Sequence, residues 1–255
     1  MQTVNTVKIK NIMLGEGCPK ICVPLVAKDE IALQQQLAAL TDQPFDLVEF
    51  RADFLQEIEN IDFALKCCDI IRNALPQTPL LFTFRRAEEG GEHAVSSEQY
   101  FSLLQAVIQS GKADVVDIEL FAGDDQVKAI TALAKQYGVV ALLCNHDFEK
   151  TPPKEEIVNR LQKMQDLGAD ICKIAVMPQS AADVITLLDA TQTMFNQYAR
   201  CPLITMAMGR LGVMSRLSGE TFGSAMTFGA AAKASAPGQI AVGDLRLILD
   251  ILSNK

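Results

Sequence analysis

The sequence predicts an α/β fold, a closed (β/α)8 TIM barrel that follows a short N-terminal β-hairpin. Eight short apolar runs of the kind that form strands alternate with stretches whose apolar residues recur at helical spacing. No linker and no change of composition interrupts this alternation, and a length of 255 residues suits one barrel. We therefore expect a single domain over residues 1–255. An open, doubly wound sheet is the alternative.

The predicted strands are short and rich in branched apolar residues. A hairpin of Val7 to Ile9 and Ile12 to Leu14 precedes them. The eight strands of the barrel are expected at residues 20–26, 47–51, 80–85, 115–119, 139–146, 171–177, 203–208 and 224–229. The sixth of them is apolar on both faces, which is typical of a central parallel strand.

The predicted helices have recognisable starts. Asp29, Asn60 and Asp124 can cap the first, second and fourth helices, and Thr151-Pro-Pro begins the fifth. The remaining helices are expected at residues 97–111, 181–198, 213–217 and 242–252. Each helix follows one strand, as a barrel of parallel strands requires.

Composition and charge exclude several classes of protein. Hydrophobic residues make up 49% of the chain, and no apolar run approaches the ~18 residues of a membrane span. The start of the chain lacks the apolar core of a secretory signal. A net charge of −8 disfavours nucleic acid as a partner. Seven cysteines without a Cys-x-x-Cys pair fit reduced thiols. We expect a cytoplasmic protein with a small-molecule substrate and no nucleic-acid or membrane partner.

Lys173 lies in the middle of the sixth predicted strand, among apolar residues. Burial removes water from an ammonium group and, where no counter-charge compensates, favours the neutral amine. A neutral amine attacks carbonyl carbon and forms a Schiff base. A structural lysine paired with a carboxylate of the barrel is the alternative, and this stretch alone favours neither.

Polar residues gather at the carboxyl ends of the predicted strands, where barrel enzymes place their sites. Because strand side chains alternate with period two, the paired residues of each strand share a face. The expected ring contains Glu49, Arg51, Thr83, Arg85, Asp117, Glu119, His146 and Lys173. Charges are seldom fully buried without partners, so packing alone explains such a ring poorly.

His146 can act as an acid and base beside an iminium, because imidazole titrates near neutral pH. The alternative is a histidine that only hydrogen-bonds a loop. Glu88 or Glu89 is a candidate to orient it, although a solvated pair of charges is equally consistent with the sequence. His93 is expected to be an exposed loop residue.

Asp117 and Glu119 allow three interpretations: a proton-sharing pair, a metal shell, or ion-pair partners of Arg51 and Arg85. We favour ion pairs. No second well-placed histidine and no metal-binding spacing supports a metal, so none is predicted.

Three further features follow the sixth strand. Arg216 lies where barrels often bind anions, and it either holds a substrate carboxylate or lies at the surface. Met206 and Met208 read as core residues more readily than as ligand contacts. Residues 235–239 have the composition of a mobile lid or of an ordinary loop.

Seven motifs in order resemble one known family over nearly the whole chain. They are Glu49-Phe-Arg51, Phe82-Thr-Phe-Arg85 with Glu88-Glu-Gly-Gly91, Asp117-Ile-Glu-Leu120, Asn145-His-Asp-Phe148, Lys173-Ile-Ala-Val-Met-Pro178, Ser215-Arg-Leu and Ala234-Ser-Ala-Pro-Gly-Gln239. Together they resemble type I 3-dehydroquinate dehydratase. The resemblance implies a cofactor-free lyase, usually a homodimer, in the shikimate pathway of aromatic amino acid and chorismate biosynthesis. Such an enzyme dehydrates 3-dehydroquinate to 3-dehydroshikimate through a lysine Schiff base.

The resemblance also implies roles for individual residues. Lys173 forms the imine, His146 moves the proton, and Glu89 orients His146. Arg216 is expected to hold the substrate carboxylate. The other implied substrate-binding residues are Glu49, Arg51, Arg85, Met206, Met208, Phe228 and the lid residues Ser235 and Gln239. Pro24 departs from the family, which has a serine at the end of the first strand, and Arg210 is either a second anion contact or solvent-facing.

Two rival functions stay open on the sequence. A Schiff-base aldolase acting on a phosphorylated sugar uses the same lysine chemistry. A non-catalytic barrel could bind a small acid with Lys173 merely ion-paired. The first would release two carbon fragments, and the second would form no covalent adduct with substrate.

Overall fold

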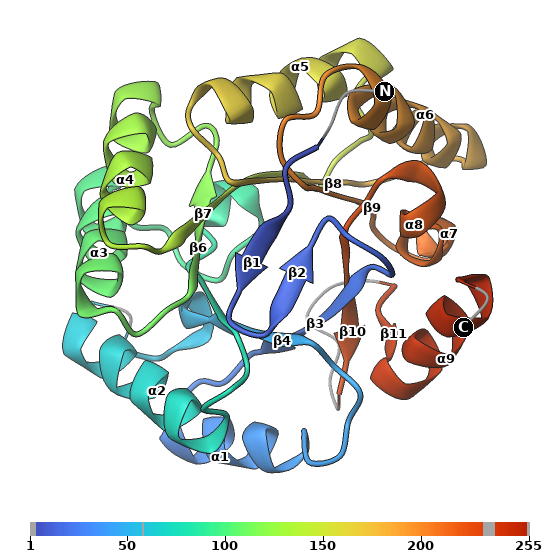
Figure 1. Cartoon of the computed structure of the whole chain (residues 1–255). Coiled ribbons are helices and arrows are strands. Elements are labelled where there is room, and N and C mark those ends of the chain that lie inside the picture. Colours follow the sequence, from blue (N-terminus) through green and yellow to red (C-terminus); the bar gives the residue numbers. More distant parts are fainter. Residues whose placement is uncertain (1–3, 58, 232–237, 254–255) are drawn as a thin grey trace.

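Parallel strands curl into a barrel with helices outside it in the computed structural model, which describes residues 4–57, 59–231 and 238–253 (Figure 1). Neighbouring strands in the sheet follow chain order, with the short β11 beside β10. They are β3 (Lys20–Leu25), β4 (Leu47–Arg51), β5 (Leu80–Thr83), β6 (Val115–Glu119), β7 (Val140–Asp147), β8 (Ile171–Val176), β9 (Leu203–Ala207), β10 (Met226–Ala230) and β11 (Ile240–Ala241).

The barrel closes between β9 and the segment that leads into β10. Ser224 forms a parallel bridge with Leu203, and the backbone N–H of Ala225 donates to the Leu203 carbonyl at 2.7 Å. β10 then pairs with β3 on its other side. The predicted barrel is thereby confirmed, and the open doubly wound sheet is wrong because the strand order never reverses at a switch point.

The helices agree with the predicted order but not with every predicted start. They are α1 (Glu30–Ala38), α2 (Ile61–Ala74), α3 (Ser97–Ser110), α4 (Asp124–Gln136), α5 (Lys154–Asp166), α6 (Ala181–Gln197), α7 (Val213–Leu217), α8 (Gly219–Phe222) and α9 (Val242–Leu252). Asp29 and Asn60 cap α1 and α2 as predicted. The cap of α4 is Gly123 instead of Asp124, with a φ of 120° that favours glycine.

Two short 3-10 turns follow strands β4 and β5. They are η1 (Ala52–Phe54) and η2 (Ala87–Glu89). The predicted third strand, expected to reach Arg85, ends at Thr83, because its pairing with β6 stops at Phe82. The freed chain then turns back through η2, which brings Glu89 over the barrel.

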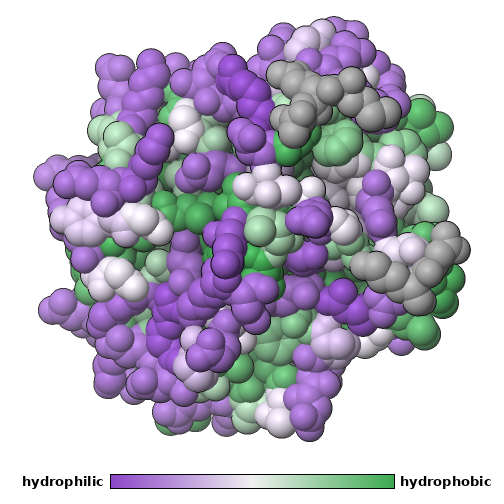
Figure 2. All heavy atoms as spheres, viewed as in Figure 1, coloured by the Kyte–Doolittle hydropathy of each residue, from purple (hydrophilic) through white to green (hydrophobic). Residues whose placement is uncertain are grey.

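The hairpin of β1 (Val7–Ile9) and β2 (Ile12–Leu14) covers one end of the barrel. Its side chains Ile9, Ile12 and Leu14 pack against the apolar residues that point into the barrel from the starts of the strands. Figure 1 shows the blue hairpin lying across the middle of the barrel. In the same view, Figure 2 shows a face covered mainly by hydrophilic residues. The barrel is therefore plugged at the amino ends of its strands, and only the opposite end is available for a site.

A second, larger core lies between the barrel and the helices. It contains the outward residues of the strands, such as Val48 and Phe50, together with the buried faces of α1 to α6 and α9. None of the helices in the described residues has the length and apolar content that a membrane crossing requires.

Candidate active site

An open pocket of about 700 Å³ lies at the carboxyl ends of the strands. Strand alternation builds it, because residues two apart share a face. On β4, Leu47 belongs to the interior core, so Glu49 and Arg51 follow it on the inward side. The lining residues are Glu49, Arg51, Phe54, Arg85, Glu89, Gly90, Glu92, His146, Phe148, Lys173, Ala175, Met206, Met208, Arg216, Phe228 and Gln239. The substrate-binding and catalytic residues implied by the resemblance line this pocket wherever the structure describes them, whereas Thr83, Asp117 and Glu119 of the expected ring do not line it.

Lys173 on β8 is a buried charged group that lines the pocket. The residue is 4% exposed, and its Nζ lies 3.6 Å from Glu49 Oε1 and 3.6 Å from Asp117 Oδ2. The ring of Phe228 lies beneath the amine, with its centroid 4.6 Å from Nζ. The absence of a counter-charge, the condition under which burial favours the neutral amine, is therefore not met. Lys173 is both ion-paired and in the pocket, so the two interpretations of the sequence are not exclusive.

The two carboxylates beside Lys173 are themselves held in place. Thr83 Oγ1 donates to Glu49 Oε1 at 2.9 Å, and Arg85 Nη2 donates to Asp117 Oδ1 at 2.8 Å. Burial alone would raise the pKa of Asp117, but the positive charges of Arg85 and Lys173 outweigh it and lower that pKa. Asp117 is therefore a fixed negative charge beneath the amine.

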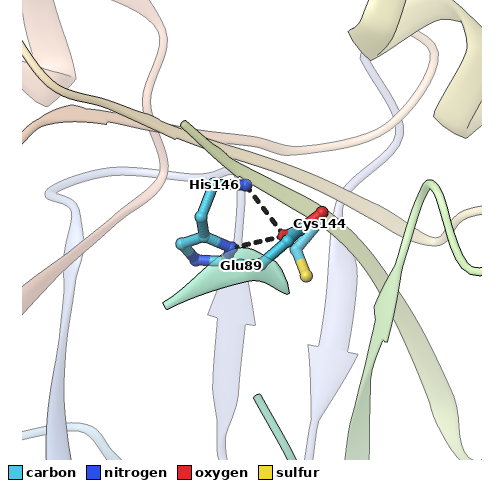
Figure 3. Close-up of side chains that lie close together, drawn as sticks. All are labelled: Glu89, Cys144 and His146. Carbon is cyan, nitrogen blue, oxygen red and sulfur yellow. Dashed lines mark hydrogen bonds and ion pairs between the residues drawn. The ribbon is translucent and has the colours of Figure 1, made fainter. Parts of the chain in front are cut away.

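His146, at the end of β7, is held by Glu89 from η2 (Figure 3). Its Nδ1 lies 3.0 Å from Glu89 Oε2, and its backbone N–H donates to the same oxygen at 2.9 Å. Asn145 Nδ2 donates to the other oxygen, Oε1, at 3.0 Å. When Glu89 is ionised its carboxylate only accepts, so Nδ1 carries the proton and the Nε2 lone pair is available to the pocket.

The environment makes this imidazole neutral. Burial, reinforced by the positive charges of Arg85 and Lys173, holds the pKa of His146 well below its ordinary value. Burial also raises the pKa of Glu89 to about 7, although Arg85 and the hydrogen bond from Asn145 oppose the rise. A neutral imidazole with an acceptor nitrogen is the form that a general base requires.

Arg85 joins most of the acidic residues of the site. Its Nη1 lies 3.1 Å from Glu119 Oε1 and 3.8 Å from Glu89 Oε2, in addition to its bond with Asp117. Arg86, which sequence reasoning missed, binds Glu119 Oε2 at 2.6 Å. The interpretation of Asp117 and Glu119 as ion-pair partners is confirmed for Arg85.

The predicted partner of Arg51 is wrong. Arg51 forms a two-bond pair with Asp53 on η1, at 2.8 Å for both Nε and Nη2, instead of pairing with Asp117 or Glu119. The 3-10 turn places Asp53 beside Arg51, whereas Arg85 occupies Asp117 and Glu119. Sequence periodicity could not reveal this pair, because η1 is neither a strand nor a regular helix.

Arg216 on α7 lies in the wall of the pocket instead of at the surface. It is 2% exposed, its Nη1 is 3.7 Å from Met206 Sδ, and burial lowers its pKa to about 10. The group still carries a positive charge at neutral pH. Met206 and Met208 are buried and line the pocket, so they are core residues and pocket walls at once.

Glu89, Cys144 and His146 offer ligand atoms within 4.8 Å of one another (Figure 3). These three do not suit a metal ion. Arg85 Nη1 lies 3.0 Å from Cys144 Sγ, so a cation is already present, and burial raises the pKa of the Cys144 thiol well above its usual range. A metal ion would need the thiolate and would meet the guanidinium.

Several smaller expectations are decided by position. Pro24 is buried opposite Glu49 in the register of β3 and β4 and offers no hydroxyl. Arg210 is exposed and does not line the pocket. Glu88 is exposed, while His93 is half-buried instead of exposed because its carbonyl accepts from Ala87 N. Ser235 lies outside the described residues.

Sequence reasoning gave no separate role to Asn145, and it did not single out Phe148 or Glu92. The strand pattern did not identify Asn145 as a site residue, because alternation places its side chain on the face opposite to that of His146. Phe148 stacks on His146 with a centroid distance of 6.5 Å, and Glu92 lines the pocket from the loop after η2. Loop residues of this kind carry no periodic signal.

A family model described as type I 3-dehydroquinase matches residues 21–255. A relative from Bacillus licheniformis, named 3-dehydroquinate dehydratase, is 55% identical over 96% of this chain and 97% of its own length. A relative of the same name from Escherichia coli is 52% identical over 98% of this chain and 99% of its own.

Solved structures agree with these sequence relatives. A type I 3-dehydroquinate dehydratase from Clostridium difficile, with covalently modified comenic acid, superposes with a TM-score of 0.96 at 46% identity, covering 99% of both chains. A 3-dehydroquinate dehydratase from Enterococcus faecalis superposes with a TM-score of 0.90 at 44% identity, covering 96% of this chain and 98% of its own.

Proposed function

Because this chain belongs to the type I 3-dehydroquinase family, we propose that it dehydrates its substrate through a Schiff base on Lys173. The enzyme is a 3-dehydroquinate dehydratase, a hydro-lyase. The proposed reaction converts 3-dehydroquinate to 3-dehydroshikimate in the shikimate pathway. One observation carries the proposal: a buried amine faces the same pocket as a neutral imidazole from the neighbouring strand.

The first step joins the amine to the ring ketone of the substrate. The ammonium loses a proton, the freed lone pair attacks the carbonyl carbon, and the oxygen takes up that proton and a second N–H proton as it leaves as water, so a positively charged iminium occupies the place of the ammonium. Glu49 and Asp117 lie 3.6 Å from that nitrogen. The same two negative charges that pair the resting lysine then stabilise the iminium, without rearrangement of the site.

The second step is elimination of the hydroxyl two carbons from the iminium carbon. The iminium withdraws electrons and acidifies the neighbouring C–H, and Nε2 of His146 takes that proton. The enamine electrons then expel the hydroxyl, which leaves as water after receiving the proton from His146. Hydrolysis of the imine consumes one water and frees the enone and Lys173, so the net reaction releases one water.

The remaining pocket residues bind the substrate. Arg216 is proposed to hold its carboxylate with two parallel hydrogen bonds, for which guanidinium is suited. Glu49, Arg51 and Arg85 bind hydroxyls or balance charge, and Met206, Met208 and Phe228 form the apolar wall. Gln239 reaches the pocket from beside β11. We propose that it belongs, with Ser235, to a lid over the bound substrate.

Borohydride trapping tests the proposal most directly. Reduction of the iminium would fix the ligand to the protein, and intact-protein mass would show one added molecule per chain when substrate is present. We expect the adduct in the wild-type enzyme and in His146→Ala, and no adduct in Lys173→Ala. Turnover, followed by the absorbance of the enone, should be lost in the lysine variant because no iminium forms.

The same experiment separates the rival functions. An aldolase would release two carbon fragments in place of an enone. A binding barrel would gain no mass with borohydride. An adduct that persists in Lys173→Ala would place the reacting amine elsewhere and overturn the assignment.

We also propose a homodimer that buries the apolar face of α7 and α9. Met214, Leu247 and Ile251 are 60%, 60% and 63% exposed on these two helices. In Figure 2 hydrophobic residues are visible at the edge of the molecule beside α9. Exposed apolar side chains gathered on one face favour association. Sedimentation should show a dimer for the wild type and a monomer for the double variant Leu247→Glu, Ile251→Glu.

A reducing compartment, the cytoplasm, is the proposed location. All seven cysteines are free thiols, although Cys172 Sγ and Cys201 Sγ lie only 3.6 Å apart. Free thiols at such a distance are typical of proteins kept reduced. Cys172 also faces the helix layer instead of the pocket, so its position beside Lys173 in sequence has no counterpart in the site.

We further propose that residues 1–255 form one catalytic domain.

A further inference from the structure

A side chain on the outside of the barrel reaches the catalytic imidazole through two hydrogen-bonded groups. Arg160 lies on α5 and does not line the pocket. Its Nη1 donates to Asn145 Oδ1 at 2.8 Å. Asn145 Nδ2 donates in turn to Glu89 Oε1 at 3.0 Å, and Glu89 Oε2 accepts from His146. The mechanism above uses the last pair and leaves the first two residues without a role.

The donor and acceptor chemistry of this row allows one orientation of the Asn145 amide. An amide has a donor end and an acceptor end, a guanidinium only donates, and an ionised carboxylate only accepts. With Arg160 on Oδ1, the NH2 group must face Glu89. Without Arg160, only the ionised Glu89 carboxylate would favour this orientation, and a protonated Glu89 could donate to Oδ1 of the reversed amide.

Arg160 is held firmly enough to impose this orientation. Its Nε donates to Glu156 Oε1 at 2.8 Å, and its guanidinium lies 5.5 Å from the centroid of the Phe121 ring. Asp147 Oδ2 lies 3.9 Å from Nη1. The side chain is 18% exposed, so both its stem and its head are packed.

We propose that Arg160 is a positioning residue for the dehydration: by occupying Asn145 Oδ1 it directs the amide N–H at Glu89 and so keeps Glu89 an acceptor for His146. This inference rests on the proposed role of His146 as the proton carrier.

The charges around Glu89 give the direction of the expected effect. Arg85 lowers the pKa of Glu89, Glu119 raises it, and the hydrogen bond from Asn145 lowers it. Loss of that hydrogen bond therefore raises the pKa further above about 7. Glu89 would then be protonated over more of the neutral range and could no longer accept from Nδ1 of His146.

The experiment compares Arg160→Met with Lys163→Met. Lys163 is a matched control because it lies on the same helix, ion-pairs with Asp124 and also faces the Phe121 ring, at 5.6 Å. The hydrogen bond to Asn145 Oδ1 comes from Arg160 instead. Each change removes one positive charge and retains an unbranched apolar stem. We expect the acidic limb of the kcat profile to move up by about 1 pH unit in Arg160→Met. The limb of Lys163→Met should coincide with that of the wild type.

Imidazole NMR gives a second readout in the resting enzyme. The chain has two histidines, so His93→Gln assigns the signal of His146. In a pH titration, the chemical shift of that signal should change where Glu89 becomes protonated. The midpoint of this change should move to higher pH by the same amount in Arg160→Met. Asn145→Asp provides a second variant, because an ionised carboxylate at this position cannot donate to Glu89. It should shift the midpoint in the same direction.

The outcomes separate this inference from the proposed function. Equal profiles for wild type and Arg160→Met, or equal shifts in Arg160→Met and Lys163→Met, would overturn the positioning role. A wild-type enzyme that gains no mass with substrate and borohydride would overturn the proposed mechanism instead. Arg160→Met should trap as well as wild type, because Lys173 stands outside this row of hydrogen bonds.

Discussion

The two ends of the barrel interior are built from the same strand faces and behave in opposite ways. At the amino ends, the inward residues are apolar, as Leu47, Leu81 and Val115 are, and the hairpin packs on them. Two residues further along the same strands, the inward positions hold Glu49, Thr83 and Asp117. A shift of two residues along each strand therefore separates a packed core from a charged pocket.

Stability and function are located at opposite ends of this barrel. Burying apolar side chains at the plugged end stabilises the protein by roughly 1.5–3 kcal/mol for each large residue. Burying charges at the open end contributes little net stability, because desolvation offsets the ion pairs. The charged residues therefore serve the reaction, and the apolar residues beneath them fix the positions of the strands that carry them. The following predictions test this division.

Among variants that retain Lys173, removal of the imidazole should reduce activity most. In His146→Ala the proton carrier is lost, and kcat should fall by about 10²–10⁴-fold while the borohydride adduct still forms. The melting temperature should change little, because the imidazole is not part of an apolar core. Stopped-flow absorbance of the enone measures the rate, and a thermal melt is the control. A variant that keeps the wild-type kcat would remove His146 from the mechanism.

Truncation of an apolar side chain at the plugged end should reduce stability and leave activity almost unchanged. Leu81 is fully buried in the interior core, and Leu81→Ala should lower the free energy of unfolding by about 2–5 kcal/mol through lost contacts and a cavity. At a temperature where the variant is folded, kcat should stay within a few-fold of wild type. Urea unfolding and steady-state kinetics measure the two quantities. A large loss of kcat in the folded variant would contradict the division between the two ends.

Replacement of Arg216, the proposed carboxylate-binding residue, should weaken substrate binding. Arg216→Lys keeps the charge but loses the planar pair of donors, so KM should rise by about 10- to 100-fold. The rate at saturating substrate should change less, because Arg216 lies away from the reacting carbons in the proposed mode of binding. Arg210→Lys, at an exposed position outside the pocket, is the matched control and should leave KM unchanged.

The pH dependence should report Glu89. As pH falls through about 7, protonation of Glu89 removes the charged acceptor of His146, so kcat should fall on the acid side. Glu89→Gln should have a lower kcat at all pH values and no such limb. A limb unchanged in Glu89→Gln would assign the titration to another group.

The same group should make a small, measurable contribution to stability. The folded pKa of Glu89, about 7, lies above the ordinary value of 4.5, so the folded state binds the proton more tightly than the unfolded state. Its stabilising contribution is complete below the unfolded pKa and is lost as pH rises through about 7. The Tm of Glu89→Gln relative to wild type should therefore increase between pH 6 and pH 8. Differential scanning calorimetry of both proteins tests the sign.

Much of the site was predictable because it depends on local patterns. Alternation along the predicted strands placed Glu49, Arg85, Asp117 and Lys173 on inward faces, although Arg85 lies just beyond the end of β5. Residues that depend on other geometry were not predictable in the same way. The pairing of Arg51 with Asp53 depends on a 3-10 turn, and the contact of Glu89 with His146 joins residues 57 positions apart.

The order of strands and helices, the direction of each strand side chain and the ring of polar residues at one end can be inferred from the amino-acid sequence. These follow from periodicity and from local chemistry, which act over a few residues. Three contacts require the folded barrel: Lys173 lies between two carboxylates, Ser224 closes the barrel, and Arg160 reaches Asn145. Those contacts depend on strand register and helix packing, and register is an outcome of how the whole barrel closes.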